Sequence, residues 1–437
     1  MLKWQMTHLA KELYFYLDKM RTGLTKKLEN IAKLAQASGR LLATLPTDTK
    51  NAVLKEMACA LLAEDDKILK ANKKDISACK GKDKAFIDRL SLTESRIKQM
   101  ADSLLDLVKI KDPVGEIIRS WGVPSGLKIN KVRTPIGVIA IIYESRPNVT
   151  SDCIGLCFKT GNSVILRGGS ESLNSNLAIF DILNRVVLGA GMPKGTINLI
   201  DTADHKAVDI LLKLNNYIDL VIPRGGEELI NKVVSSSRIP VIKHYKGICH
   251  VYVDDEADLN MAEKICFNAK VQRPGVCNAM ESMLVHRDVA VRFLPGMLKN
   301  FKDAQVEIRG CAFTKKIAKW VKAACEKDYR TEYLDLILSV KVVDNLDGAI
   351  SHINNYGSHH SDCIVTDNCK TAEKFLKEVD SACVYVNAST RFTDGYQFGM
   401  GAEIGISTDK LHARGPMALE ELTTYKYVVY GSGQVRE

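Results

Sequence analysis

The chain has no long apolar run, which limits where it can act. Its 437 residues contain no stretch near the ~18 consecutive apolar residues that a membrane-spanning helix needs. The most apolar run, Val138–Ile142, suits a buried strand instead. With no secretory signal recognisable at the start, we expect a soluble, cytoplasmic protein without a membrane partner.

Aromatic residues are also scarce. They make up 6% of the chain, and no basic stretch is interleaved with them as a stacking platform for single-stranded nucleic acid would require. The net charge of +9 is spread along the chain among acidic residues, and the lysine-rich stretch 67–74 is typical of a solvated helix face. We therefore expect no nucleic-acid partner, although a modest positive field attracts anionic substrates.

Disulfide and zinc patterns are missing despite twelve cysteines. No C-x-x-C pair occurs and the spacings are irregular, which favours a reduced compartment. His359 and His360 lie near Cys363, but without the spacing of a zinc site. No metal is expected.

The length predicts two or three domains. The opening third has helical periodicity over 24–42, a break at Pro46, and a capping-box spacing of Ser91 and Glu94 that predicts a helix start. Residues 113–134 alternate as a hairpin would. From Gly137 strands and helices alternate, which indicates two parallel α/β sheets. The expected strands are 138–143, 164–167, 196–200 and 220–223, then 251–253, 283–285, 363–366 and 384–387.

Both common phosphate-binding motifs, G-x-G-x-x-G and the P-loop, are absent. Two other glycine loops follow predicted strands: Arg167-Gly168-Gly169-Ser170 and Arg224-Gly225-Gly226. α/β sheets bind ligands at the carboxyl ends of their strands, and an arginine beside exposed amides at a helix start suits an anion. Simple tight turns explain the same glycines, so the loops alone leave both interpretations open.

One cysteine stands in an unusual setting. Pro274-Gly275 precedes Cys277, which predicts that the thiol lies on a turn just before the segment Asn278–Met283. Amide dipoles at the turn and the charge of Arg273 would favour the thiolate. The alternative is that Cys277 is one of twelve mostly buried, small apolar side chains, and its position alone does not establish catalysis.

Several separated motifs resemble those of one enzyme superfamily. They are Pro135–Ala140 with Tyr143–Asn148, Gly161–Ser170, Gly191–Gly195, Gln272–Asn278, Gly401–Gly405 and His412–Pro416. Together they resemble the aldehyde dehydrogenase superfamily, from about Gly23 to Tyr430. The region Val343–Ile364, with its Ala349, His352-Ile353, Tyr356–Ser358 and His360–Asp362, is similar to the signature of the gamma-glutamyl phosphate reductase family within it.

The resemblance implies an α/β, aldehyde dehydrogenase-like fold with a parallel-sheet cofactor domain, an α/β catalytic domain and a β-hairpin oligomerisation element. We expect an N-terminal extension over 1–22 and an NADP-binding domain over 23–246, to which 384–403 return. The hairpin 113–134 interrupts this domain. A catalytic domain over 247–383 and an oligomerisation tail over 404–437 complete the expected homo-oligomer.

The resemblance also assigns roles to residues. It implies that Cys277 is the nucleophile, that Asn148 holds the oxyanion with the main-chain N–H of Cys277, and that Glu403 holds the nicotinamide ribose. Arg167 and Ser170 stand where NAD-preferring relatives often carry lysine and glutamate. Without a carboxylate at Ser170, NADPH is favoured, although the neighbouring Glu171 weighs against this.

Roles for the cofactor diphosphate and for the substrate are assigned less specifically. The loop Arg224–Gly226 resembles one that approaches the cofactor diphosphate. Arginines recognise carboxylate and phosphate in bidentate fashion, and the arginines suited to the substrate are Arg146, Arg273 and Arg391.

One departure from hydrolytic aldehyde dehydrogenases is informative. They carry a general-base glutamate just before a Gly-Gly pair, whereas here the stretch reads Lys243–His250 with His244 nearest that position. A reductase must keep water from its thioester, so this loss fits reduction. A base role for His244 stays open.

By the resemblance, we expect NADPH-dependent reduction of L-glutamate 5-phosphate to glutamate 5-semialdehyde through a cysteine thioester, the second step of proline biosynthesis. A separate glutamate 5-kinase would supply the substrate. The alternatives are an NAD-dependent hydrolytic semialdehyde dehydrogenase and an inactive scaffold. The scaffold is disfavoured because Cys277, Asn148 and Glu403 occur together.

Overall fold

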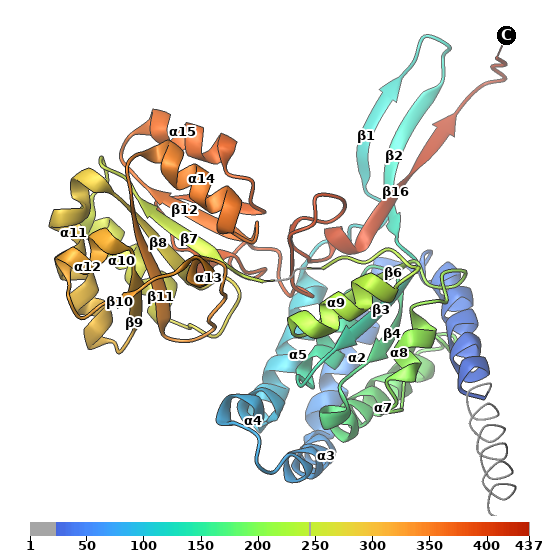
Figure 1. Ribbon diagram of the computed structural model, residues 1–437. Helices are drawn as coiled ribbons and strands as arrows, with labels where there is room; N and C mark the ends of the chain where they lie inside the picture. Colours follow the sequence, from blue (N-terminus) through green and yellow to red (C-terminus); the bar gives the residue numbers. More distant parts are fainter. Residues whose placement is uncertain (1–22, 244–245, 437) are drawn as a thin grey trace, which may run out of the picture. The chain divides into compact units, whose positions relative to one another are not determined.

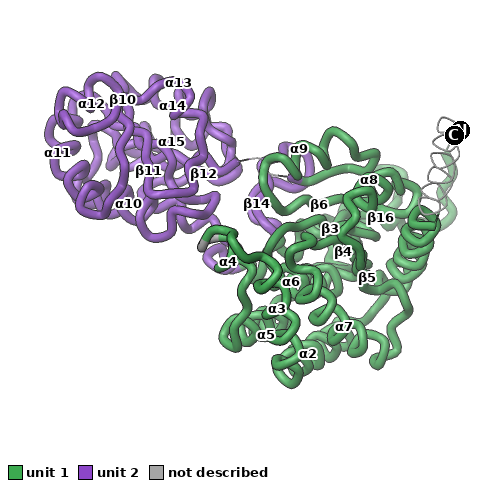
Figure 2. Tube along the Cα trace, turned by 60° about the horizontal axis from the view of Figure 1, so that its bottom comes forward, with its two compact units in different colours: residues 1–242, 400–404, 418–437 green, residues 243–399, 405–417 purple. Residues whose placement is uncertain are grey.

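The computed structural model describes residues 23–243 and 246–436, which form two compact units (Figure 2). Unit 1 contains the described residues up to Ile242, then Met400–Ile404 and the C-terminal part from Ala418. Unit 2 contains Lys243–Gly399 and Gly405–Met417. Within the described ranges, no helix combines the length and apolarity needed to cross a membrane.

Helices open unit 1, as the periodicity predicts. Residues 23–42 are helical, and α2 (Thr47–Ala63), α3 (Asp65–Ala78), α4 (Lys84–Leu90) and α5 (Glu94–Lys109) follow. The predicted capping box is wrong in detail, because α5 already begins at Glu94. Thr93 is its N-cap and accepts the N–H of Arg96, whereas Ser91 ends α4 and donates its hydroxyl to Ile87 O at 2.6 Å.

A four-stranded parallel sheet forms the centre of unit 1. Its order is β5-β4-β3-β6, with β3 (Val138–Tyr143), β4 (Ser163–Arg167), β5 (Ile197–Leu199) and β6 (Leu220–Arg224). The connecting helices are α6 (Asn148–Lys159), α7 (Leu173–Gly189), α8 (Lys206–Leu211) and α9 (Glu227–Ser236). Every residue of β3 and β4 is buried, which explains their unbroken apolar runs. The four predicted strands are confirmed.

The predicted hairpin also exists. It consists of β1 (Ile117–Gly122) and β2 (Lys128–Pro135), and β16 (Thr423–Tyr430) adds a third antiparallel strand to β2. This sheet projects from the rest of unit 1 (Figure 1) and exposes Tyr425, Tyr427 and Val429 of β16. Its role in oligomerisation stays a prediction.

Unit 2 is built on a seven-stranded parallel sheet in the order β10-β9-β11-β8-β7-β12-β13. Successive residues of a strand face opposite sides. One side packs on α10–α12, and the other packs on α14 and α15. The strands are β7 (Cys249–Val253), β8 (Met280–His286), β9 (Glu307–Gly310), β10 (Lys322–Ala323), β11 (Ile337–Val343), β12 (Ser361–Val365) and β13 (Cys383–Val386); the helices are α10 (Leu259–Val271), α11 (Arg287–Asp303), α12 (Ala312–Ile317), α13 (Glu326–Tyr329), α14 (Leu346–Tyr356) and α15 (Cys369–Glu378).

Two features of unit 2 differ from expectation. Strands β9, β10 and β11 are absent from the predicted set. The predicted return of 384–403 to the cofactor domain is wrong for 384–399, because β13 is hydrogen-bonded in parallel to β12, and only Met400–Ile404 group with unit 1. The expected tail over 404–437 is likewise divided, since β14 (Ile406–Ser407) and β15 (Gly415–Pro416) lie in unit 2.

Candidate active site

The thiol of Cys277 lies where the sequence predicts it. The residue is half-buried on the turn between α10 and β8, and Ala279 N–H closes the turn on Val276 O at 3.1 Å. Because Cys277 lies on a turn, it takes no part in strand pairing. The position therefore suits a group that must meet a substrate.

The backbone of Cys277 is in tight contact with the residues just before β7. A Cβ atom placed on Gly247 would lie 1.8 Å from the carbonyl oxygen of Cys277 and 2.5 Å from its Cα. The buried thiol of Cys249 donates to the same carbonyl oxygen at 3.2 Å. Residue 247 must therefore be glycine if the turn is to keep this place.

Asn278 holds the other side of the turn, a role that the sequence reasoning missed. Its side-chain amide donates to Thr393 O at 2.8 Å, and the hydroxyl of Thr390 donates to Asn278 O at 2.8 Å. The position directly after Cys277 in the motif was the available signal. These bonds attach the turn to the segment that carries Arg391.

Two of the three predicted substrate arginines gather near the thiol. Arg391 Nε donates to Gln272 Oε1 at 2.9 Å. Burial lowers the pKa of Arg391, the neighbouring Arg273 lowers it further, and the nearby Cys277 opposes both. Two guanidinium groups that repel each other beside a thiol suit a multiply charged anion. The third, Arg146, is exposed in unit 1.

Asn148 is the first residue of α6 in unit 1. Its amide nitrogen lies 3.2 Å from Asp152 Oδ2, one turn along the helix. Burial raises the pKa of Asp152 to about 6, against the lowering effect of hydrogen bonds from Ser103 and Asn148. An internal partner therefore orients the predicted oxyanion donor.

The loop after β4 has features suited to a cofactor phosphate. Arg167 is buried at the strand end; its Nη2 donates to Ala203 O at 3.3 Å, while its Nε has no hydrogen-bond partner among the residues that the structure describes. Ser170 is exposed. A buried guanidinium with a spare donor beside an exposed hydroxyl fits an anionic ligand.

Glu171 is the residue that weighs against NADPH in the sequence, and its carboxylate already accepts hydrogen bonds within the protein. Its Oε1 accepts both the backbone N–H and the hydroxyl of Ser145, at 2.8 and 2.6 Å. Burial alone would raise the pKa of Glu171, but the bonds from Ser145 lower it overall. A Cβ on Gly169 would lie 2.2 Å from this carboxylate, so a side chain there would displace the Glu171 carboxylate.

The second glycine loop is more constrained than expected. Gly226 is the N-cap of α9, and its N–H donates to Glu144 Oε2 at 2.8 Å. A Cβ on Gly225 would lie 2.4 Å from the same oxygen. In the loop expected to approach the cofactor diphosphate, the Gly226 amide is thus bonded to a side chain of unit 1. Sequence reasoning missed Glu144, although it directly follows a predicted strand.

Glu403 is half-buried in the short segment Met400–Ile404 of unit 1. Gly401, with φ of +80°, packs so closely that a Cβ would meet Ile110 at 2.2 Å, which fixes the segment. His244 and the predicted extension 1–22 lie outside the described residues.

A possible ligand set for a cation lies elsewhere in unit 2. Ligand atoms of Asp255, His286 and Asp288 lie within 4.8 Å of one another at the carboxyl ends of β7 and β8. The thiol turn precedes β8, at the opposite end of that strand. The expectation that no metal is needed stays a prediction.

Comparison with known proteins gives a consistent result. The aldehyde dehydrogenase family model matches residues 16–315. The chain is 58% identical to the gamma-glutamyl phosphate reductase of Thermodesulfovibrio yellowstonii, over 93% of this chain and 98% of that one. The crystal structure of gamma-glutamyl phosphate reductase from Thermotoga maritima superposes with a TM-score of 0.92 at 46% identity, covering 94% and 100%. Glyceraldehyde-3-phosphate dehydrogenase GapN from Methanocaldococcus jannaschii, complexed with NADP, shares the fold at 15% identity, with a TM-score of 0.66 and coverage of 93% and 95%.

Proposed function

This chain belongs to the gamma-glutamyl phosphate reductases, oxidoreductases of the aldehyde dehydrogenase fold, and we propose that it reduces L-glutamate 5-phosphate to glutamate 5-semialdehyde with NADPH. The observation that carries the proposal is the Cys277 turn. It presents a thiol against a rigid backbone support, with Arg273 and Arg391 beside it.

Cys277 acts as the nucleophile. Its thiolate attacks the acyl carbon of the substrate, the carbon–oxygen bond to phosphate breaks, and a thioester forms. The N–H of Cys277 donates to the oxyanion, and the family resemblance implies a second donor in the amide of Asn148; removing one such donor costs roughly 3 kcal/mol. Bound NADPH supplies the hydride that reduces the thioester. The thiohemiacetal then releases the aldehyde and regenerates the thiol.

Arg273 and Arg391 receive the phosphate. Their mutual repulsion is relieved when a dianionic group lies between them, and guanidinium groups bind phosphate through two hydrogen bonds. Arg146 is retained as a ligand for the substrate carboxylate.

The preference for NADPH rests on the loop after β4. Ser170 carries no charge that would repel a 2′-phosphate, and Glu171 is engaged by Ser145. Arg167 offers a spare donor. Glu403 would hold the nicotinamide ribose and the loop Arg224–Gly226 would bind the diphosphate, as the family resemblance implies.

The thioester is reduced, not hydrolysed, because no glutamate stands where hydrolytic relatives carry their general base. The aldehyde product cyclises to pyrroline-5-carboxylate, which makes this the second step of proline biosynthesis. A separate glutamate 5-kinase supplies the acyl phosphate.

The exposed face of β16, with Tyr425 and Tyr427, joins copies of the chain into a homo-oligomer.

The test is the reverse reaction, NADP reduction by glutamate 5-semialdehyde. It should require phosphate or arsenate, whereas a hydrolytic NAD-dependent enzyme would turn over without either. Cys277→Ser should lose at least ~10³-fold in kcat because the nucleophile is removed. Cys369→Ser, an exposed cysteine of unit 2, is the matched control and should behave as wild type. Phosphate-independent turnover, or full activity in Cys277→Ser, would overturn the proposal.

A further inference from the structure

Residues 325–335 of unit 2, here called the strap, connect β10 to β11 and include α13. In the neighbouring strands, Ile308 and Leu338 point into the core formed with α10–α12. Arg309 and Ser339 alternate with them and therefore lie on the opposite face of the sheet. This polar face provides the attachment for the strap.

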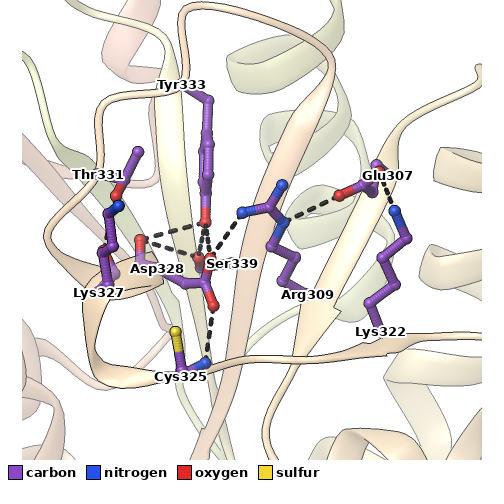
Figure 3. Close-up of polar contacts among 9 residues, drawn as sticks. All are labelled: Glu307, Arg309, Lys322, Cys325, Lys327, Asp328, Thr331, Tyr333 and Ser339. Atoms are coloured by element: carbon purple, nitrogen blue, oxygen red, sulfur yellow. Dashed lines mark hydrogen bonds and ion pairs between the residues drawn. The ribbon is translucent and has the colours of Figure 1, made fainter.

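Asp328 fixes the first half of the strap to that face. Its carboxylate accepts the N–H of Cys325 at 2.7 Å and a guanidinium N–H of Arg309 at 2.7 Å, and Tyr333 Oη donates to it at 3.2 Å. Figure 3 shows Arg309 between Asp328 on one side and Glu307 on the other. The guanidinium also lies 5.0 Å from the centre of the Tyr333 ring. These contacts form a connected network that holds the strap in one conformation.

The second half of the strap reaches the support of the thiol turn. Glu332 Oε1 accepts the N–H of Gly247 at 2.9 Å. Two residues on, Leu334 N–H donates at 3.1 Å to Glu281, whose other carboxylate oxygen pairs with Lys270 at 2.7 Å in the fully buried interior. The strap is thus hydrogen-bonded to Gly247, which precedes Cys277 in the chain, and to Glu281, which follows it.

Gly247 lies at the point of closest contact with Cys277, because the two backbones leave no room for a side chain. The N–H groups that follow are also held by side chains: Ile248 by Ser358 Oγ at 2.8 Å, and His250 by Asp362 Oδ1 at 2.8 Å. These two partners come from the region 343–364. Glu332 holds the N–H of the glycine itself.

We propose that Glu332 is a positioning residue for Cys277: its hydrogen bond to Gly247 N–H, on a strap anchored by Asp328 and Arg309, keeps the thiol turn in its reactive place. The inference rests on the proposed function of Cys277. Displacements near 1 Å at a reacting group cost about 10²-fold in rate. Loss of the bond should therefore act on kcat and leave substrate binding largely intact.

The experiment compares Glu332→Ala with Glu332→Gln. The alanine variant removes the acceptor, whereas glutamine keeps a carbonyl oxygen at the same place and removes only the charge. We expect Glu332→Ala to lower kcat about 10- to 100-fold with KM changed less than about threefold. Glu332→Gln should stay within about threefold of wild type. Glu373→Ala, which removes an exposed carboxylate on α15, is the matched control.

A second measurement does not depend on the reaction. Amide hydrogen exchange of peptides covering 246–250 and 273–278 should speed up in Glu332→Ala and stay at the wild-type rate in Glu332→Gln. Wild-type kcat in the alanine variant, equal losses in both variants, or unchanged exchange in the alanine variant would overturn the inference. Failure of the proposed function looks different, since Cys277→Ser would then keep turnover whatever the Glu332 variants do.

Discussion

Gly247→Ala directly tests the tight contact between residue 247 and the backbone of Cys277. The added methyl group would lie 1.8 Å from Cys277 O, whereas ordinary contacts begin at about 3.4 Å, so one backbone must move by roughly 1.6 Å. The φ of Gly247 lies outside the left-handed region, so no left-handed strain is expected from alanine. The expected effect is therefore steric alone.

The magnitude follows from that displacement. A shift of this size at the nucleophile should cost about 10²-fold in kcat/KM, equivalent to ~2.7 kcal/mol of transition-state stabilisation. Overpacking of a filled interior should also lower the free energy of unfolding by about 1–3 kcal/mol. The activity loss should exceed what the small unfolded fraction explains.

The assay is phosphate-dependent NADP reduction, normalised to the amount of folded protein measured by urea unfolding. Gly296→Ala is the control, because this exposed glycine of α11 has no atom within 4 Å of the added Cβ. It should leave kcat/KM unchanged and gain up to ~1 kcal/mol in stability from helix propensity. If Gly247→Ala kept kcat/KM within threefold of wild type, the tight support of Cys277 would not be a functional constraint.

Two further predictions concern the charges around the strap. Lys270→Met leaves the carboxylate of Glu281 buried without its cation and should cost about 3–5 kcal/mol in urea unfolding. Most of this loss should return in the double variant Lys270→Met/Glu281→Leu, and no recovery would contradict the unpaired-charge argument. For Asp328, burial acts to raise the pKa, but bonds from Cys325 N–H and Arg309 prevail and lower it to about 2. This depressed pKa contributes about 2 kcal/mol above pH ~4, which is lost as the pH falls toward 2. Asp328→Asn should therefore flatten the decline of stability across that window, and an unchanged slope would argue against it.

Two of the correctly predicted strands show why the sequence could reveal them. β3 and β4 are buried along their whole length, so their apolar runs are visible without knowledge of any partner. β11 was missed although Leu338–Val342 alternates apolar and polar residues as a strand does, and the place of Ser339 on the polar face that carries the strap emerges only when the sheet is formed. The same holds for β13, whose sheet is decided by hydrogen bonds to β12 and not by its own pattern.

The sequence by itself determined the local features: the turn at Cys277, the glycine loops after β4 and β6, and the motifs that identify the family. Each depends on residues close together in the chain. Only the tertiary structure decided what supports them. Glu332 meets Gly247 across 85 positions, and Glu144 meets Gly226 across 82. No local periodicity encodes such pairs, because they exist only after separate strands and loops have packed against one another.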